Sequence, residues 1–153
     1  MLHWFKKKAI DFFSPQDKEQ IVAAIKEAEH QTSGEIRVYI ESECSYTDSL
    51  NRAIELFDNL EMYKTDKRNG VLIYVAMKTR KLAVYGDEGI YQQVGKGFWD
   101  GQIDKMIHHF NKNDYAEGIA TVVSEVGNAL KQHFPYNAQT DVNELPDDIV
   151  FGN

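Results

Sequence analysis

Five acidic side chains lie close to glycines or to the ends of apolar runs, where carboxylates could act together. They are Glu35, Asp66, Asp87, Glu88 and Asp100. The stretch from 84 to 101, VYGDEGIYQQVGKGFWDG, carries three of these acids and five of the ten glycines of the chain. Carboxylate oxygens on loops with flexible backbone suit a hard cation, which takes six or more oxygen ligands. The residue types therefore favour a divalent-cation site, and Ca²⁺ is the expected ion.

Several of these acids also have a simpler structural interpretation. Glu35 suits a solvated strand end, Asp66 a turn with Asn69-Gly70, and Asp100 a helix cap. Without a cation, neighbouring carboxylates repel one another and the site costs stability. The sequence thus leaves three functions open: a cation-binding domain, a metal-assisted phosphatase, and a protein-interaction module whose acids are solvated.

Other reactive side chains form no recognisable catalytic or metal-binding motif. Cys44 is followed six residues later by Leu50, where a cysteine phosphatase loop needs arginine. His108 and His109 are neighbours, so on a helix they point about 100° apart and cannot bind one metal ion together. No pairing of a nucleophile with a base stands out.

Hydrophobic patterning predicts three strands that position the acids. Residues 35–41 alternate between apolar and polar, and residues 70–76 are continuously apolar, as in a strand covered on both faces. Residues 81–85 follow a short polar turn and pair with 70–76 as an antiparallel hairpin. A helical crossover makes the first two strands parallel. The acids brought to one end of the sheet are then Glu35, Asp66, Asp87 and Glu88, and Asp100 could join them.

The glycines beside Asp87 and Glu88 are expected to serve this site. Gly86 and Gly89 permit backbone angles that other residues resist, which would end the third strand abruptly. Lacking a Cβ, they would also let carbonyl oxygens approach a cation closely.

Helical periodicity surrounds these strands with about four helices. The first begins at Ser14-Pro15, where serine suits the cap and proline the first turn. Apolar stripes predict further helices over 50–60, 103–110 and 115–130, and Asp114 with Glu117 resembles a capping box for the last. The expected fold is α/β: a three-layer α/β/α sandwich whose small mixed sheet has two parallel strands and an antiparallel hairpin partner.

The chain of 153 residues, 42% of them hydrophobic, is the size of one ordinary domain with a real core. We divide it into an amphiphilic N-terminal segment, 1–13, an α/β domain, 14–136, and an acidic tail, 137–153, which is expected to be flexible. The N-terminal segment is expected to pack on the domain, with membrane-surface contact as the alternative.

Charge and composition limit the partners and the compartment. A net charge of -7 disfavours nucleic acid and anionic lipid, because both would be repelled. One cysteine excludes an internal disulfide, and no apolar run approaches the roughly 20 residues of a membrane span. No signal peptide is recognised. We expect a cytoplasmic monomer whose partner is a divalent cation, or another protein if the interaction alternative holds.

Short motifs occur along the chain in a fixed order: Thr32-Ser33-Gly34-Glu35-Ile36, Asp66-Lys67-Arg68-Asn69-Gly70-Val71, Gly86-Asp87-Glu88-Gly89, Asp100, and Asn113-Asp114-Tyr115 with Gly118-Ile119. In this order they resemble the TPM domain family, over residues 15–134. That family includes thylakoid-lumen proteins linked to photosystem II repair and many bacterial proteins. The resemblance implies an α/β/α sandwich, binding of Ca²⁺ or another divalent cation in loops, and, from plant members, acid phosphatase activity.

The resemblance also implies which residues hold the metal. Glu35, Asp66, Glu88 and Asp100 fall on acidic positions of the family. Asp87 is an additional carboxylate, at a position where many members have an apolar residue. Glu88 and Asp100 are also farther apart in sequence than the equivalent acids of many relatives.

Overall fold

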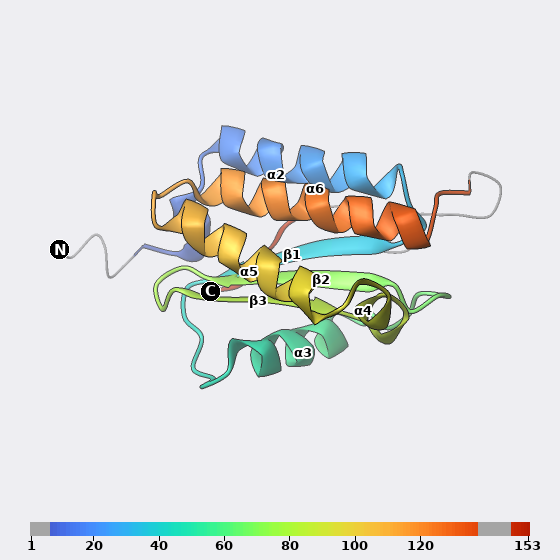
Figure 1. The fold of residues 1–153 in the computed structure, drawn as a ribbon. Coiled ribbons are helices and arrows are strands. Elements are labelled where there is room, and N and C mark those ends of the chain that lie inside the picture. The colour runs from blue at the N-terminus through green and yellow to red at the C-terminus, as the bar shows by residue number, and fades with distance from the viewer. Residues whose placement is uncertain (1–6, 138–147) are drawn as a thin grey trace.

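The computed structural model describes residues 7–137 and 148–153, which form one mixed sheet with helices on both faces (Figure 1). The helices are η1 (Ala9–Phe12, a 3-10 helix), α2 (Pro15–Glu29), α3 (Ser49–Asn59), α4 (Glu88–Val94), α5 (Lys96–Phe110) and α6 (Tyr115–His133). The strands are β1 (Glu35–Glu41), β2 (Gly70–Ala76), β3 (Lys81–Gly86) and β4 (Val150–Phe151).

The sheet has the strand order β3-β2-β1-β4. β1 is parallel to β2 and places Glu35 opposite Gly70, whereas β3 is antiparallel to β2 and places Gly86 opposite Val71. The starts of β1 and β2 and the end of β3 therefore meet at one end of the sheet. This confirms the topology predicted from the sequence.

Two hydrophobic clusters, one on each face of the sheet, pack the sheet against the helices. The cluster between the sheet and α2, α5 and α6 includes Ile36, Val38 and Ile40 from one face of β1. The cluster under α3 takes Leu72 and Tyr74 from the opposite face of β2. Every residue of β2 is buried, as expected for a strand covered on both faces. Figure 1 shows the three layers, and the predicted α/β/α sandwich is confirmed.

The glycine-rich stretch after β3 is more helical than the sequence predicts. It contains α4, and α5 begins at Lys96 instead of near Ile103. Among the described glycines only Gly95, between the two helices, has a positive φ, of 78°. The expected special backbone angles at Gly86 and Gly89 are thus wrong; both glycines are needed for close packing. A Cβ on Gly89 would lie 2.1 Å from the Lys67 carbonyl oxygen.

The N-terminal segment packs on the domain, as expected, over the residues that are described. Ala9 and Phe13 are buried in the same cluster as α2 and α6. A second local expectation is wrong: the Asp114 side chain makes no cap hydrogen bond. Glu117 instead accepts a hydrogen bond from Gln20 on α2, so its side chain links α6 to α2.

The end of the chain also differs from the expected flexible tail. Val150 and Phe151 form β4, which pairs with β1 in parallel, and Ile149 is buried. The physical reason is that β1 would otherwise be an edge strand with unpaired backbone groups. Residues 138–147 lie outside the described residues, so the expectation of flexibility remains untested for them.

Candidate functional site

Two of the predicted cation ligands are held by a guanidinium group. Arg68 Nε and Nη2 donate to the two carboxylate oxygens of Asp87, at 2.7 and 2.9 Å. Arg68 Nη1 donates to Glu88 Oε1 at 2.9 Å. The hydrogen bonds to Asp87, with the charges of both acids, raise the pKa of Arg68. Arg68 therefore occupies the position between these carboxylates that a cation was expected to take.

The same contacts fix the backbone where β3 gives way to α4. Asp87 is only 2% exposed, and its carboxylate caps α4 by accepting the Glu88 amide at 2.8 Å. The Asp87 amide donates to Gly70 O, and the Gly89 amide donates to Arg68 O. Arg68 itself has a positive φ of 51°, in the left-handed region. Asp87 is thus a structural residue that joins the turn before β2 to the start of α4.

Among the described residues, Arg68 bonds to none of the three remaining predicted ligands. Glu35 is buried at the start of β1, and its charge acts on Arg37. Burial lowers the pKa of Arg37, and the carboxylates of Glu29, Asp148 and Glu35 oppose that effect. Asp66 is exposed in the turn that precedes β2.

Asp100 is exposed on α5 and faces a groove. The structure therefore joins Asp87 and Glu88 through Arg68. Glu35 and Asp66 lie at the same end of the sheet, at the start of β1 and in the turn before β2, whereas Asp100 lies on α5.

These side chains do not fit a divalent cation as they stand. Within residues 7–137 and 148–153, no group of three or more His, Cys, Asp or Glu side chains could hold a metal ion. A guanidinium already balances the charge of Asp87 and Glu88, and Glu88 is largely exposed. A hard cation needs several convergent oxygens in place of that guanidinium. Calcium binding at this end of the sheet stays a prediction.

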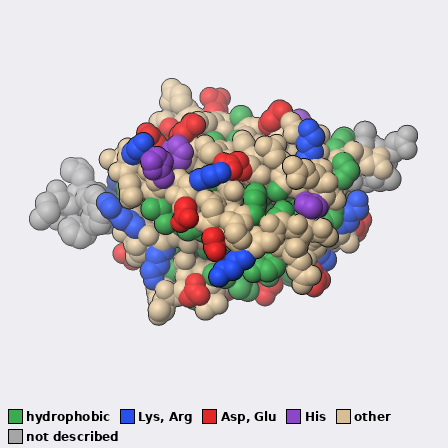
Figure 2. Space-filling view, viewed as in Figure 1, with side chains coloured by type: hydrophobic (Ala, Val, Ile, Leu, Met, Phe, Trp, Pro, Cys, Tyr) green, Lys and Arg blue, Asp and Glu red, His purple; other side chains and the backbone are tan. Residues whose placement is uncertain are grey.

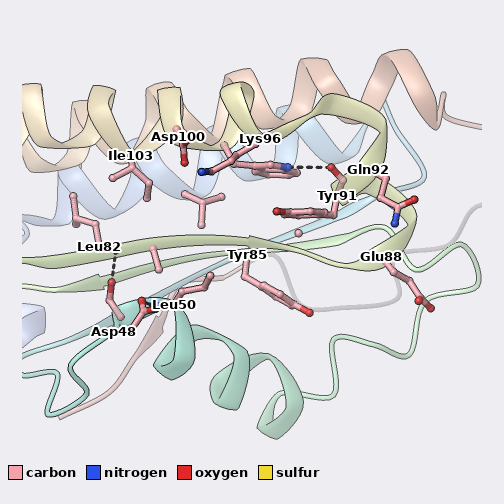
Figure 3. A pocket seen from close by; sticks show the side chains of 15 residues that line it. Asp48, Leu50, Leu82, Tyr85, Glu88, Tyr91, Gln92, Lys96, Asp100 and Ile103 are labelled. Atoms are coloured by element: carbon pink, nitrogen blue, oxygen red, sulfur yellow. Dashed lines mark hydrogen bonds between the residues drawn. The ribbon is translucent and has the colours of Figure 1, made fainter.

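A groove of about 550 Å³ runs along β3 (Figure 3). Its floor is formed by residues 82–86 of β3. Leu50 of α3 lies on one side of the strand, and Ile103 of α5 lies on the other. On the face shown in Figure 2, hydrophobic side chains reach the surface among acidic and basic ones. The groove has the size of a ligand-binding site and, like such sites, is lined by apolar, aromatic and charged side chains.

An aromatic pair forms part of the wall on the α5 side. The rings of Tyr91 and Trp99 stack with centroids 6.2 Å apart and an angle of 5° between their planes. Trp99 Nε1 donates to the Tyr91 carbonyl oxygen at 3.2 Å, which fixes the indole. Trp99 is only 6% exposed, whereas Tyr91 is 48% exposed and offers one ring face or edge to solvent. Tyr91 is therefore a rigidly backed aromatic surface.

Acidic side chains outnumber basic ones around the groove. Asp48, Glu88 and Asp100 line it, and Lys96 is the one basic residue among the lining residues described. Figure 3 places Lys96 and Asp100 on α5, Asp48 beside α3 and Glu88 at the start of α4. Two residues predicted as metal ligands thus line this groove: Asp100, and Glu88, whose charge Arg68 balances.

A buried polar cluster at the opposite end of the sheet fixes α3, which forms one wall of the groove. Glu41 of β1 accepts two hydrogen bonds from Arg52 of α3, both of 2.9 Å, and one from the Tyr74 hydroxyl. Arg52 also donates to Glu55, which accepts from Tyr46. Burial and the hydrogen bond to Glu41 raise the pKa of Tyr74. The cluster is a structural network that sets the position of α3 on the sheet.

Comparison with known proteins identifies the family. The TPM domain profile matches residues 7–129. This chain belongs to the TPM domain family. Among solved structures, it is similar to the BA42 protein of the psychrophilic bacterium Bizionia argentinensis, with 37% identity and a TM-score of 0.84 over 94% of this chain and 97% of that one. The comparison with curated proteins finds no match.

More distant structures share the fold of this TPM domain. The N-terminal domain of the cg2496 protein from Corynebacterium glutamicum is 16% identical, with a TM-score of 0.61 over 77% of this chain and 74% of that one. The N-terminal domain of a P. gingivalis protein is 20% identical, with a TM-score of 0.65 over 82% and 83%. In the described part of the chain, no helix has the length and apolar character needed to cross a bilayer.

Sequence reasoning missed Arg68 and the aromatic pair. Arg68 lies in the motif that supplied Asp66, and the two bases of that motif, Lys67 and Arg68, could have suggested an ion pair in place of a cation. Tyr91 and Trp99 lie on different helices, and the backbone reversal at Gly95 brings them together. No sequence periodicity predicts that stacking.

Proposed function

We propose that this TPM domain binds a segment of another protein in the groove along β3. The observation that carries the proposal is an open groove of about 550 Å³ with an apolar floor and an exposed, rigidly backed tyrosine. Pockets of roughly 300–1,000 Å³ are typical of ligand sites, and exposed tyrosines are enriched at protein interfaces. This is the interaction-module alternative that the sequence left open.

The pairing of Asp87 and Glu88 with Arg68 favours peptide binding over a metal-assisted phosphatase. A phosphatase of that kind needs a cation to polarise a phosphoryl oxygen. Here the guanidinium of Arg68 pairs with Asp87 and Glu88, and Asp100 lies on the groove wall. The groove offers apolar surface, an aromatic ring and solvated acids, which suit recognition of a polypeptide.

Peptide selection with two matched tyrosine variants tests the proposal. Random decapeptides displayed on phage are selected on the immobilised wild-type domain, and the enriched peptides are measured on Tyr91→Ala and Tyr136→Ala. Tyr136 is 46% exposed, close to the 48% of Tyr91, but is absent from the groove lining. We expect Tyr91→Ala to weaken binding by about tenfold or more, as for an interface hot spot. Tyr136→Ala should bind like the wild type.

Two results would contradict groove binding. One is that no peptide is enriched on the wild-type domain. The other is that enriched peptides bind both variants as tightly as the wild type, which places their site elsewhere. The ¹⁵N spectrum of each variant, recorded first, shows that the fold is intact.

Divalent-cation binding is the second candidate function, and the topology favours it. The turn before β2 and the end of β3 meet, so the segments of Asp66, Asp87 and Glu88 are neighbours. A cation at this position has to displace Arg68. We expect Ca²⁺ to shift amides at 34–36, 65–70 and 86–90, to spare 77–80, and to bind Arg68→Ala more tightly than the wild type. Shifts centred on 77–80, or no gain in Arg68→Ala, would exclude this site.

A further inference from the structure

We propose that the bound segment adds to the sheet as a fifth strand beside β3 and carries basic residues between apolar ones. The inference rests on the proposed function and specifies the form and the charge of what the groove binds. Three features carry it: the outer edge of β3, the two walls of the groove, and the excess of acidic side chains along it.

Among the described strands, β3 lies at the edge of the sheet, because it pairs with β2 alone in the order β3-β2-β1-β4. The Asp87 amide donates to Gly70 O, which makes Asp87 and Gly70 a hydrogen-bonded pair of the antiparallel ladder. Such pairs alternate along the strands. Tyr85 and Ala83 therefore bond to β2, whereas Leu82, Val84 and Gly86 direct their N–H and C=O groups outward.

One side chain of the protein already bonds this edge. Ser49 Oγ donates to the Leu82 carbonyl oxygen at 2.7 Å, which confirms that this carbonyl points outward (Figure 3). Beyond it, the outward backbone groups of Val84 and Gly86 accept or donate no hydrogen bond within the described residues. An edge with regularly spaced donors and acceptors is a template for an added strand.

The groove runs along this edge over residues 82–86, where Val84 and Gly86 are buried. Both Val84 and Gly86 line it. Leu50 lies on the α3 side, and Ile103 and Tyr91 lie on the α4 and α5 side. Alternate side chains of an added strand point to opposite faces. One set would therefore contact Leu50 and Tyr85, and the other set would contact Tyr91 and Ile103.

Charge favours a basic segment and opposes a second copy of this chain. Asp48, Glu88 and Asp100 line the groove with one described base, Lys96. Because Arg68 pairs with Glu88, the excess of negative charge comes from Asp48 and Asp100. The chain carries a net charge of -7, so two copies paired through β3 would bring like charges together. Lysine or arginine in a partner strand would instead face Asp48 and Asp100.

The test of strand addition uses the tightest decapeptide from the selection above and versions of it methylated at one backbone nitrogen at a time. A strand bonds its neighbour through every second residue, so methylation at alternate positions should weaken binding at least tenfold and methylation between them should change it little. The amides of Val84 and Gly86 should also become protected from hydrogen exchange when the peptide is bound.

The outcomes separate this inference from the proposed function. A peptide that depends on Tyr91 but shows no alternation, or a spacing of three to four residues, binds the groove in another form and overturns strand addition alone. Failure to enrich any peptide that depends on Tyr91 overturns both. Peptide-free dimers that depend on β3 would identify a second copy as the occupant and would also overturn the inference.

A second pair of variants tests the charge. Asp100→Asn removes one acid of the groove, whereas Asp104→Asn removes an exposed acid of α5 that is not among the lining residues. Exposed ion pairs change affinity modestly, so Asp100→Asn should weaken binding by about two- to fivefold and reduce its salt dependence. Asp104→Asn should change neither. Enrichment of neutral or acidic peptides would overturn the basic character of the segment.

Discussion

Arg68 turns two carboxylates that were predicted to bind a cation into members of an ion pair. Asp87 and Glu88 are adjacent, and two unpaired carboxylates repel each other. The guanidinium pairs with both, and its planar fork matches the two oxygens of Asp87. Arg68 adopts a left-handed backbone conformation, which is unfavourable for a residue with a Cβ. The ion pairs and the hydrogen bond from Gly89 to Arg68 O offset that cost.

The first prediction compares the two acids held by Arg68. Asp87 is buried and caps α4 as well as pairing with Arg68, so Asp87→Asn should lower the free energy of unfolding by about 1–3 kcal/mol. Glu88 is exposed, and Glu88→Gln should change it by less than about 1 kcal/mol. Urea unfolding at pH 7 without metal measures both. A gain of stability in Asp87→Asn would mean that repulsion between the acids dominates, as in an empty cation site.

The second prediction concerns Gly89. A Cβ at this position would lie 2.1 Å from Lys67 O and 2.6 Å from Arg68 O, and backbone atoms cannot move aside cheaply. Gly89→Ala should therefore cost about 1–3 kcal/mol in urea unfolding, the range for overpacking. Gly97→Ala is the control, because a Cβ there meets no atom within 4 Å. Equal stability of the two variants would show that the turn relaxes away from α4.

At the scale of elements, regular patterns were predictable and long-range contacts were not. The alternation in β1, the apolar run in β2 and the cap at Ser14 each follow from local sequence, and all three are found. α4 was missed because glycines flank it, although its cap, Asp87, precedes it directly.

The candidate site was predictable only in part. Topology alone brought the segments of Asp66 and Asp87 together, but the pairing of Arg68 with Asp87 depends on side chains nineteen residues apart. The groove depends on α3, β3 and α5 together, and no single segment of sequence indicates it.

The third prediction uses the buried tyrosine of β2. The pKa of Tyr74 is raised above its ordinary value near 10, first by burial and then by the hydrogen bond to Glu41. Above about pH 10 the tyrosine of the unfolded chain loses its proton, while Tyr74 of the folded chain keeps it. The free energy of unfolding therefore falls as the pH rises above 10. Burial also raises the pKa of Tyr39 and of Tyr85, and the hydrogen bond to Glu55 raises that of Tyr46, so they add to this slope.

Urea unfolding at several pH values from 8 to 11 measures the effect. For each proton that the folded state keeps and the unfolded state loses, the free energy of unfolding falls by about 1.4 kcal/mol per pH unit. Tyr74→Phe should be less stable at pH 8, because the hydrogen bond to Glu41 is lost, but its stability should fall less steeply above pH 10. Parallel curves for the two proteins would show that Tyr74 ionises as readily in the folded state as in the unfolded chain.

At the scale of the whole molecule, the first and last described segments both pack into the domain. η1 packs near β1 on the face of the sheet that α2 and α6 cover, and β4 pairs with β1 at the edge opposite β3. The rings of Phe13 and Phe151 lie 6.1 Å apart, so the first and last described segments contact each other. Within the described residues, β4 therefore covers one edge of the sheet, and β3 forms the other edge at the groove.

The last prediction tests whether the end of the chain belongs to the fold. Ile149 is 7% exposed and lies in the cluster with α2 and α6, directly before β4. Ile149→Ala should lower the free energy of unfolding by about 2–4 kcal/mol, as for other buried isoleucines, whereas a residue of a flexible tail would leave it unchanged. Gln132→Ala, at an exposed position of α6, is the control and should have little effect. Because β4 covers the edge of β1, Ile149→Ala should also speed hydrogen exchange of the amides of β1 more than those of β3. Uniform exchange in both strands, with unchanged stability, would mean that the sheet does not depend on β4.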